Sequence, residues 1–213
     1  MIIIFDWDGT LCDSVEQIVA TMQEAAIELS LEPPAQGDIR NIVGLGLPQA
    51  MSKLFPGLDD ASATALTLAY SRIYSAPERP PTALFAGAME TLLELRERGL
   101  ELAVATGKSR RGLDRVLGSL GLAEFFEVTR CADETQSKPH PQMLLEIMAS
   151  RGKASGEVLM VGDTEYDLEM ANHARVRSVG VSFGVHSRER LARHQPLAII
   201  DDLAELLDLA ALG

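Results

Sequence analysis

The sequence MIIIFDWDGTLCDS, residues 1–14, is the stretch from which the fold can be predicted. Its four apolar residues Ile2 to Phe5 are typical of a strand that is buried on both faces of a parallel sheet. Asp6 and Asp8 follow this strand, and Gly9 ends it. Open α/β sheets bind their ligands beyond the carboxyl ends of the strands, which is where these two carboxylates stand. Two interpretations are open at this point: a solvated strand end with two caps, or an aspartate nucleophile beside an aspartate acid/base and a metal.

Composition and charge narrow the class of protein. The chain has 213 residues, 46% hydrophobic and 23% charged, which is ordinary for a globular protein with one large domain or a core with a smaller insert. Its 31 acidic and 19 basic residues give a net charge of −12, which argues against nucleic acids and anionic membranes as partners. The chain has two cysteines without metal-ligand spacing and no apolar run of about 20 residues. We also recognise no leader sequence, and we therefore expect a cytoplasmic protein.

The rest of the chain divides into a helical part and an alternating part. From Ser14 to about Pro81 the pattern is helical, with Asp13-Ser14 as an N-cap pair, and we expect helices at about 15–29, 39–43, 48–54 and 59–76. A proline-rich linker follows at 77–81. Beyond Phe85 we expect helices at 87–98, 109–120 and from 142, and strands at 102–105, 125–128, 158–161, 176–181 and 198–200.

These patterns predict an α/β fold. Its core, residues 1–14 and 82–213, would be a Rossmann-like parallel sheet with helices on both faces. An all-helical cap, residues 15–81, would be inserted after the first strand.

Polar residues suited to phosphoryl chemistry end three of the expected strands. Thr106 and Asp163 end two of them, Asp6 and Asp8 end the first, and Lys138 lies in a loop. Because parallel strands deliver their carboxyl ends to one edge, these residues can converge. A carboxylate can attack phosphorus and split one difficult step into two. Asp6 and Asp163 supply carboxylates for Mg²⁺, while Lys138 and the Thr106 hydroxyl would hold phosphoryl oxygens.

The ordered motifs resemble a known family. Asp6-x-Asp8-x-Thr10, Thr106 after an apolar strand, Lys138-Pro139 and Gly162-Asp163-x-x-x-Asp167 resemble the four motifs of the haloacid-dehalogenase-like hydrolases, over essentially the whole chain. The segment after the first motif resembles the helical cap of the subclass that contains phosphoglycolate phosphatases. The resemblance implies that Asp6 is the nucleophile and Asp8 the general acid/base.

The same resemblance implies the binding residues. Thr10, Thr106, Gly107 and Lys138 would bind the substrate phosphate. The implied ligands of Mg²⁺ are Asp6, the Asp8 backbone carbonyl and Asp163, with Asp167 supporting the metal site and Lys138. Two positions depart from the family pattern: Trp7 is bulkier than the usual aliphatic residue, and Arg175 stands where relatives commonly end a helix with glycine.

In the cap, Arg40 lies close to a turn with two glycines, Gly44-Leu45-Gly46, that allows close backbone approach to a substrate. We expect Arg40 to bind a second anionic group of the substrate, such as a carboxylate. The alternative, that Arg40 lies on a solvated helix face, stays open.

We therefore predict a Mg²⁺-dependent phosphatase that hydrolyses a small phosphate monoester, phosphoglycolate-like or a sugar phosphate, through an aspartyl-phosphate intermediate. Its partner would be a small phosphorylated metabolite, and its state a monomer or homodimer. The main alternative is a phosphomutase resembling β-phosphoglucomutase, although Gly44 lacks the flanking basic residues of such mutases. A pyrophosphatase or nucleotidase of the same fold stays open. A dehalogenase is disfavoured because it would have no use for Asp8. A non-catalytic binding protein is disfavoured because it should have lost at least one motif residue, and all of them are present.

Overall fold

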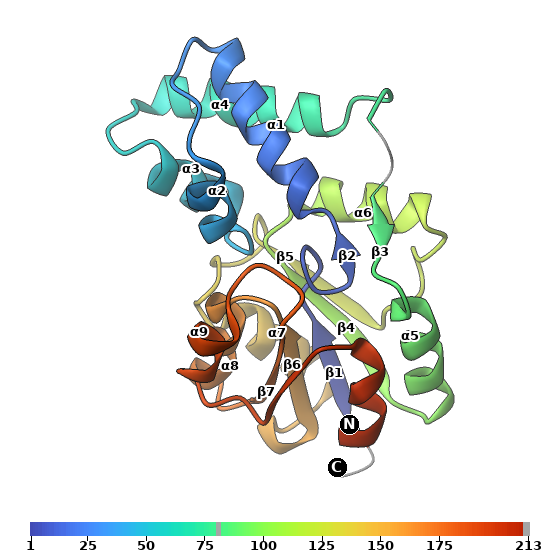
Figure 1. Ribbon diagram of the computed structural model, residues 1–213. Helices are drawn as coiled ribbons and strands as arrows, with labels where there is room; N and C mark the ends of the chain where they lie inside the picture. Colours follow the sequence, from blue (N-terminus) through green and yellow to red (C-terminus); the bar gives the residue numbers. More distant parts are fainter. Residues whose placement is uncertain (80–81, 211–213) are drawn as a thin grey trace.

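A six-stranded parallel sheet lies at the centre of the structure, a computed structural model that describes residues 1–79 and 82–210 (Figure 1). The strands stand in the order β5-β4-β1-β6-β7-β8, and each runs parallel to its neighbours. Their bounds are β1 (Ile2–Phe5), β4 (Glu101–Thr106), β5 (Val128–Cys131), β6 (Val158–Gly162), β7 (Arg177–Val181) and β8 (Ala198–Ile200). The first strand of the sequence therefore occupies the middle of the sheet, between β4 and β6.

Helices cover both faces of this sheet, because alternate side chains of a strand point to opposite faces and both sets are apolar here. Ile3 and Phe5 of β1 pack with α5 (Ala88–Glu97), α6 (Arg110–Ser119) and α10 (Leu206–Ala210). Ile2 and Ile4 pack with α7 (Gln142–Arg151) and α8 (Glu165–His173). Shorter elements are η1 (Ser155–Glu157), α9 (Arg188–Ala192) and η2 (Leu203–Glu205). The predicted α/β fold is confirmed. In the described part of the chain, no helix combines the length and apolar character needed to cross a membrane.

Four further helices pack together beyond the carboxyl end of the sheet, as Figure 1 shows. We call them the helical segment, residues 15–74: α1 (Val15–Glu28), α2 (Gln36–Ile42), α3 (Leu47–Leu54) and α4 (Asp60–Tyr74). They have a core of their own, to which each helix contributes, for example through Met22, Ile39, Met51 and Leu66. As predicted, every element described between residues 15 and 79 is a helix.

A short ribbon joins the helical segment to the sheet. β2 (Cys12–Asp13) and β3 (Ala83–Leu84) pair antiparallel, so the chain enters and leaves the segment at adjacent points. The expected linker at 77–81 ends in Pro80 and Pro81, which lie outside the described residues. The domain boundaries themselves stay a prediction.

One expected strand is wrong. The strand expected at 125–128 is β5 instead, Val128–Cys131, and the phenylalanines before it lie in a turn. Phe125 and Phe126 pack edge to face at 5.3 Å, and Phe126 packs edge to face on the buried Trp7 at 6.2 Å. β5 is an edge strand with polar residues at Thr129 and Arg130, so an apolar run does not mark it. Phe125 and Phe126 therefore pack into the hydrophobic core on one face of the sheet and are not part of the strand.

Arg175 follows α8 with a φ of 57°, in the left-handed region that favours glycine. We expect Arg175→Gly to raise the free energy of unfolding by about 1 kcal/mol, because it relieves this conformation. Arg175→Ala removes the same exposed charged side chain but keeps the strained φ, so it should show no gain. Urea denaturation of the three proteins tests this, and equal midpoints for the glycine and alanine variants would contradict the backbone explanation.

Candidate active site

A buried lysine lies between two buried carboxylates at the carboxyl end of the sheet. Lys138 Nζ donates to Asp6 Oδ1 at 2.6 Å and lies 2.7 Å from Asp167 Oδ1. Asp6 directly follows β1, and its N–H donates to the Val161 carbonyl of the adjacent β6 at 2.9 Å. The central position of β1 thus brings together groups that lie far apart in the sequence.

Asp163 joins this group from the end of β6. Its Oδ1 accepts from the Thr10 hydroxyl and its Oδ2 from the Val185 N–H, each at 2.9 Å. Asp6, Asp163 and Asp167 can each offer one oxygen within 4.8 Å of the others. Three buried carboxylates, two from adjacent strand ends and one from α8, therefore lie close together.

Asp167 is oriented by the start of α8. Its Oδ2 accepts from the Thr164 N–H at 3.1 Å and from the Thr164 hydroxyl at 2.7 Å, a capping-box arrangement. The other oxygen, Oδ1, is the one that faces Lys138. The cap of α8 thus turns one carboxylate oxygen toward the ammonium.

The charges of this cluster do not balance. If all three carboxylates are ionised, they stand against one ammonium and leave an excess of two negative charges in a buried place. Burial raises the pKa of Asp6 well above its usual value, against the opposing effect of Lys138. Burial, followed by the charge of Asp167, raises the pKa of Asp163 to about 7. Burial alone would lower the pKa of Lys138, but Asp167 and Asp6 raise it.

This cluster fits a divalent cation. Its donors are carboxylate oxygens, which Mg²⁺ prefers, and two positive charges would balance the excess. Asp6 Oδ2 is buried and has no hydrogen-bond partner among the described residues, which is the state expected of a carboxylate that interacts with a group from outside the chain. The expected ligands Asp6 and Asp163 are thus together, and Asp167 lies beside them.

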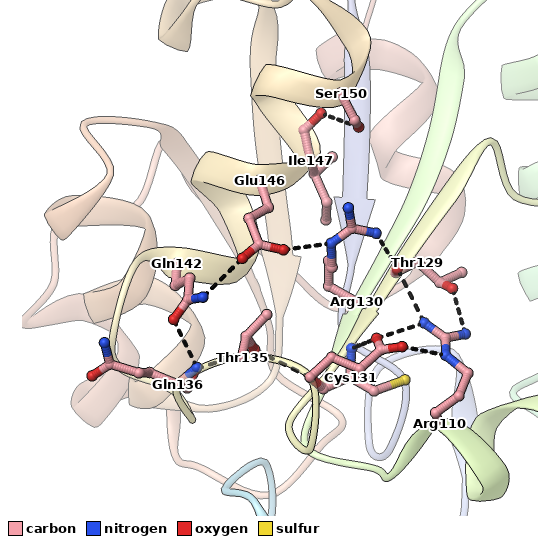
Figure 2. A network of polar contacts seen from close by, with 11 residues as sticks. Arg110, Thr129, Arg130, Cys131, Thr135, Gln136, Gln142, Glu146, Ile147 and Ser150 are labelled. Carbon is pink, nitrogen blue, oxygen red and sulfur yellow. Dashed lines mark hydrogen bonds and ion pairs between the residues drawn. The ribbon is translucent and has the colours of Figure 1, made fainter.

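A network of polar contacts fixes the loop that carries Lys138, between β5 and α7 (Figure 2). At the start of the loop the Cys131 N–H donates to Glu134 Oε2, and the Thr135 hydroxyl donates to the Cys131 carbonyl, each at 3.1 Å. The Arg110 guanidinium of α6 donates to both oxygens of Glu134, at 2.9 and 2.8 Å. The loop is thereby tied to the helix that follows β4.

The second half of the same network ties the loop to α7 (Figure 2). The Gln136 N–H donates to Gln142 Oε1 at 3.0 Å, and Gln142 Nε2 donates to Glu146 Oε1 at 2.8 Å. Glu146 also accepts from Arg130 Nε of β5 at 2.8 Å. The loop before Lys138 is therefore held from both ends, which limits where its ammonium can lie.

Asp8 has different neighbours from Asp6. Its Oδ1 accepts from the Ser14 hydroxyl and lies 3.0 Å from Lys108 Nζ. Ser14 was expected to cap α1, but its side chain makes no capping bond, because its hydroxyl is turned toward Asp8. Neither contact could be read from helix patterns. Lys108 stands two residues after Thr106 at the same edge of the sheet, and that position is the signal that could have marked it.

Besides Lys138, three residues are expected to bind the substrate phosphate, and their surroundings differ. Thr106 is buried, and its hydroxyl oxygen accepts from the Lys108 N–H at 3.1 Å. Gly107 lines a cavity of about 710 Å³ between the core and the helical segment, as does Asp8. Thr10 donates to Asp163 instead, so its hydroxyl is committed to the carboxylate cluster rather than free for a phosphate.

Arg40 is not one of the described residues that line this cavity. Its guanidinium pairs with Glu16 of α1 in a partly exposed place. The geometry therefore does not support the expected contact of Arg40 with a substrate. The basic side chains that do line the cavity are Lys108, Arg72, Arg111 and Arg115.

The turn 43–46 of the helical segment sits directly on the core. The Gly46 N–H donates to Ser137 Oγ at 2.8 Å, next to Lys138. A Cβ on Gly107 would lie 2.5 Å from the Leu45 carbonyl oxygen and 2.7 Å from that of Gly44. The helical segment is therefore closed over the edge of the sheet, and Gly107 permits that contact.

Comparison with known proteins places this fold and site in a family. A sequence model of the family described as "Haloacid dehalogenase-like hydrolase" matches residues 3–181. The "Probable phosphatase IndB" of Dickeya dadantii is 33% identical, over 98% of this chain and 93% of its own length. A phosphoglycolate phosphatase of Pseudomonas putida is 31% identical, over 97% of this chain and 78% of its own length. The chain therefore belongs to the haloacid dehalogenase-like hydrolases, as its motifs predicted.

Solved structures agree with this assignment. The crystal structure of a hydrolase from Pseudomonas syringae has a TM-score of 0.88 at 27% identity and covers 100% of this chain and 98% of its own. That of a predicted phosphatase from Clostridium acetobutylicum has a TM-score of 0.87 at 25% identity, covering 99% and 98%. The protein is thus an enzyme of this hydrolase family, and its fold is similar to those of solved hydrolases.

The contact at Gly107 can be tested by adding one methyl group. Gly107→Ala should push the 43–46 turn off the core, because its Cβ would overlap two backbone carbonyl oxygens. We expect faster hydrogen exchange in the turn and a loss of hydrolase activity of ~10-fold or more. Gly118→Ala in α6 is the matched control, because a Cβ there meets nothing within 4 Å. Unchanged exchange in Gly107→Ala would show that the turn is not seated on this glycine.

Proposed function

We propose that the protein is a Mg²⁺-dependent phosphatase that hydrolyses a phosphate monoester through an aspartyl-phosphate on Asp6. The observation that carries the proposal is the state of the Asp6 carboxylate. One oxygen is held by Lys138 at 2.6 Å, and the other is buried without a hydrogen-bond partner among the described residues. A carboxylate oriented in this way, with one oxygen uncommitted, suits attack on phosphorus. The names of the phosphatase relatives support the same reaction class.

In the first step Asp6 attacks phosphorus, and the bond between phosphorus and the ester oxygen breaks. Asp8 gives a proton to the departing alkoxide, so an alcohol leaves. The Ser14 hydroxyl and the Lys108 ammonium, both in contact with Asp8 Oδ1, orient this carboxyl group. Asp6 and Asp8 thus have separate tasks because they have separate neighbours.

In the second step Asp8 takes a proton from water, and the water oxygen attacks the phosphorus of the aspartyl-phosphate. The acyl phosphate bond breaks, which restores Asp6 and releases inorganic phosphate. Lys138 and Thr106 would hold phosphoryl oxygens throughout. Mg²⁺, held by Asp6, the Asp8 carbonyl and Asp163, would neutralise charge on the phosphoryl group.

The helical segment has a place in this reaction. We propose that residues 15–81 form a cap that excludes bulk water while the acyl phosphate exists. Its hinge would be the β2–β3 ribbon, where both connections lie side by side. The closed turn at 43–46 contains no basic residue, so nothing there offers a second phosphate site of the kind a mutase needs. The turn itself therefore gives no support to the phosphomutase alternative.

The nucleophile is tested by Asp6→Asn. This variant keeps the shape but removes the attacking charge and a metal ligand, so kcat should fall by roughly three orders of magnitude or more. Asp60→Asn, which alters an exposed carboxylate at the start of α4, is the matched control and should retain full activity. Phosphate release from phenyl phosphate measures both, with circular dichroism as a check of folding. A folded Asp6→Asn protein with substantial activity would refute the mechanism.

The metal site is tested by thermal stability, independently of turnover. Mg²⁺ should raise the Tm of the chelator-treated protein, because an ion that binds the folded state alone stabilises it. In Asp163→Asn the shift should shrink by more than half, while Asp60→Asn should show the full shift. A Tm indifferent to Mg²⁺ in the unmodified protein would contradict a metal at this cluster.

A further inference from the structure

One wall of the cavity carries two arginines that the proposed chemistry does not use. Arg111 and Arg115 of α6 both line the cavity, and their spacing of four residues places them on the same face of the helix. Lys108, just before α6, lines the same wall. This positive face belongs to a chain with a net charge of −12.

The two arginines are not committed to neighbouring carboxylates. Neither Arg111 nor Arg115 forms an ion pair with any residue in the described part of the chain. By contrast, Arg110 pairs with Glu134, and the lining residue Arg72 pairs with Glu28. Two guanidinium groups beside a cavity are therefore available to an anionic ligand, for which the planar guanidinium is well suited.

A series of contacts connects Arg115 to Asp8. Lys108 Nζ is 3.0 Å from Asp8 and 4.8 Å from the ring of Tyr74, and the Arg115 guanidinium lies on that ring at 5.9 Å. Asp8 and Arg115 are therefore linked through the side chains of Lys108 and Tyr74. Arg115 also lies about 6 Å farther along the helix than Arg111. A ligand that contacts both guanidinium groups therefore has to extend along α6.

The opposite wall of the cavity comes from the helical segment and is largely apolar. It includes Met22, Ile42, Leu45 and Leu68, together with Tyr70, whose ring stacks on Tyr74 at 5.7 Å. The volume of about 710 Å³ is within the range of roughly 300–1,000 Å³ that suits drug-sized ligands. The cavity thus offers an apolar surface opposite a basic one, and its volume is greater than a two-carbon ester needs.

We propose that the substrate is a phosphate monoester longer than phosphoglycolate, with an apolar body and a second anionic group that Arg111 and Arg115 bind. The inference deepens the proposed phosphatase function and rests on it. The apolar body lies along the wall of the helical segment, and the phosphate lies at Asp6. Specificity thus comes from α6 of the core, not from Arg40.

The test uses a series of carboxylic acids that carry a terminal phosphate ester. Phosphoglycolate is the first member, and added methylene groups lengthen the others. Each acid is compared with its own methyl ester, in which the carboxylate charge is removed and the phosphate is kept. The ratio of the two kcat/KM values then measures the contribution of the carboxylate. We expect this ratio to be near one for phosphoglycolate and to reach ~10-fold or more for a longer member.

The double variant R111Q/R115Q should bring the ratio of the longer members back toward one. Because both arginines are exposed and unpaired among the described residues, we expect the variant to fold. Arg193→Gln is the matched control, because Arg193 is an exposed arginine that follows α9 and is not one of the described residues lining the cavity, and this variant should keep the full ratio.

The outcomes separate the two proposals. Failure to hydrolyse any ester, including phenyl phosphate, would overturn the phosphatase function and this inference with it. Hydrolysis with a ratio that is greatest for phosphoglycolate, or near one for all members, would overturn the inference alone. So would a ratio that survives in R111Q/R115Q. A ratio that rises with length and is lost only in the double variant supports it.

Discussion

The buried contact of Lys138 with Asp6 and Asp167 is the interaction on which the rest of the site depends. It holds one oxygen of Asp6 in place and leaves the other uncommitted. Removing one partner of such a group would leave uncompensated buried charge, at a cost of about 3–5 kcal/mol. The polar network of the β5–α7 loop (Figure 2) and the cap of α8 both serve this contact, since each fixes one of its members. The excess negative charge that remains is what makes a divalent cation the fitting partner.

The strand order explains why the site assembles at one edge. β1 lies between β4 and β6, so Asp6, Thr106 and Asp163 follow three adjacent strands that all point the same way. The helical segment then closes over this edge, and its turn rests on Gly107. In the proposed mechanism the buried cluster would hold the phosphoryl group, and the cavity next to it would hold the rest of the substrate.

Much of this could be predicted from sequence because it depends on strand ends. A run such as Ile2 to Phe5 is apolar only if both faces are covered, and parallel strands bring their carboxyl ends together. Contacts between side chains of different elements could not be predicted in the same way. The sequence predicts that Ser14 caps a helix, but its hydroxyl donates to Asp8. It also predicts that Arg40 binds the substrate, but Arg40 pairs with Glu16. The edge strand β5 was misplaced because exposed edges need no apolar run.

The central claim, that Asp6 carries the phosphoryl group, is tested most directly by chemical trapping. The protein is mixed with excess phenyl phosphate and Mg²⁺, quenched with acid during turnover and treated with borohydride, which reduces an acyl phosphate to an alcohol. Mass spectrometry of the N-terminal peptide should then find homoserine at position 6, in proportion to turnover and absent without substrate. Active enzyme that yields no homoserine, or yields it at position 8, would contradict the account.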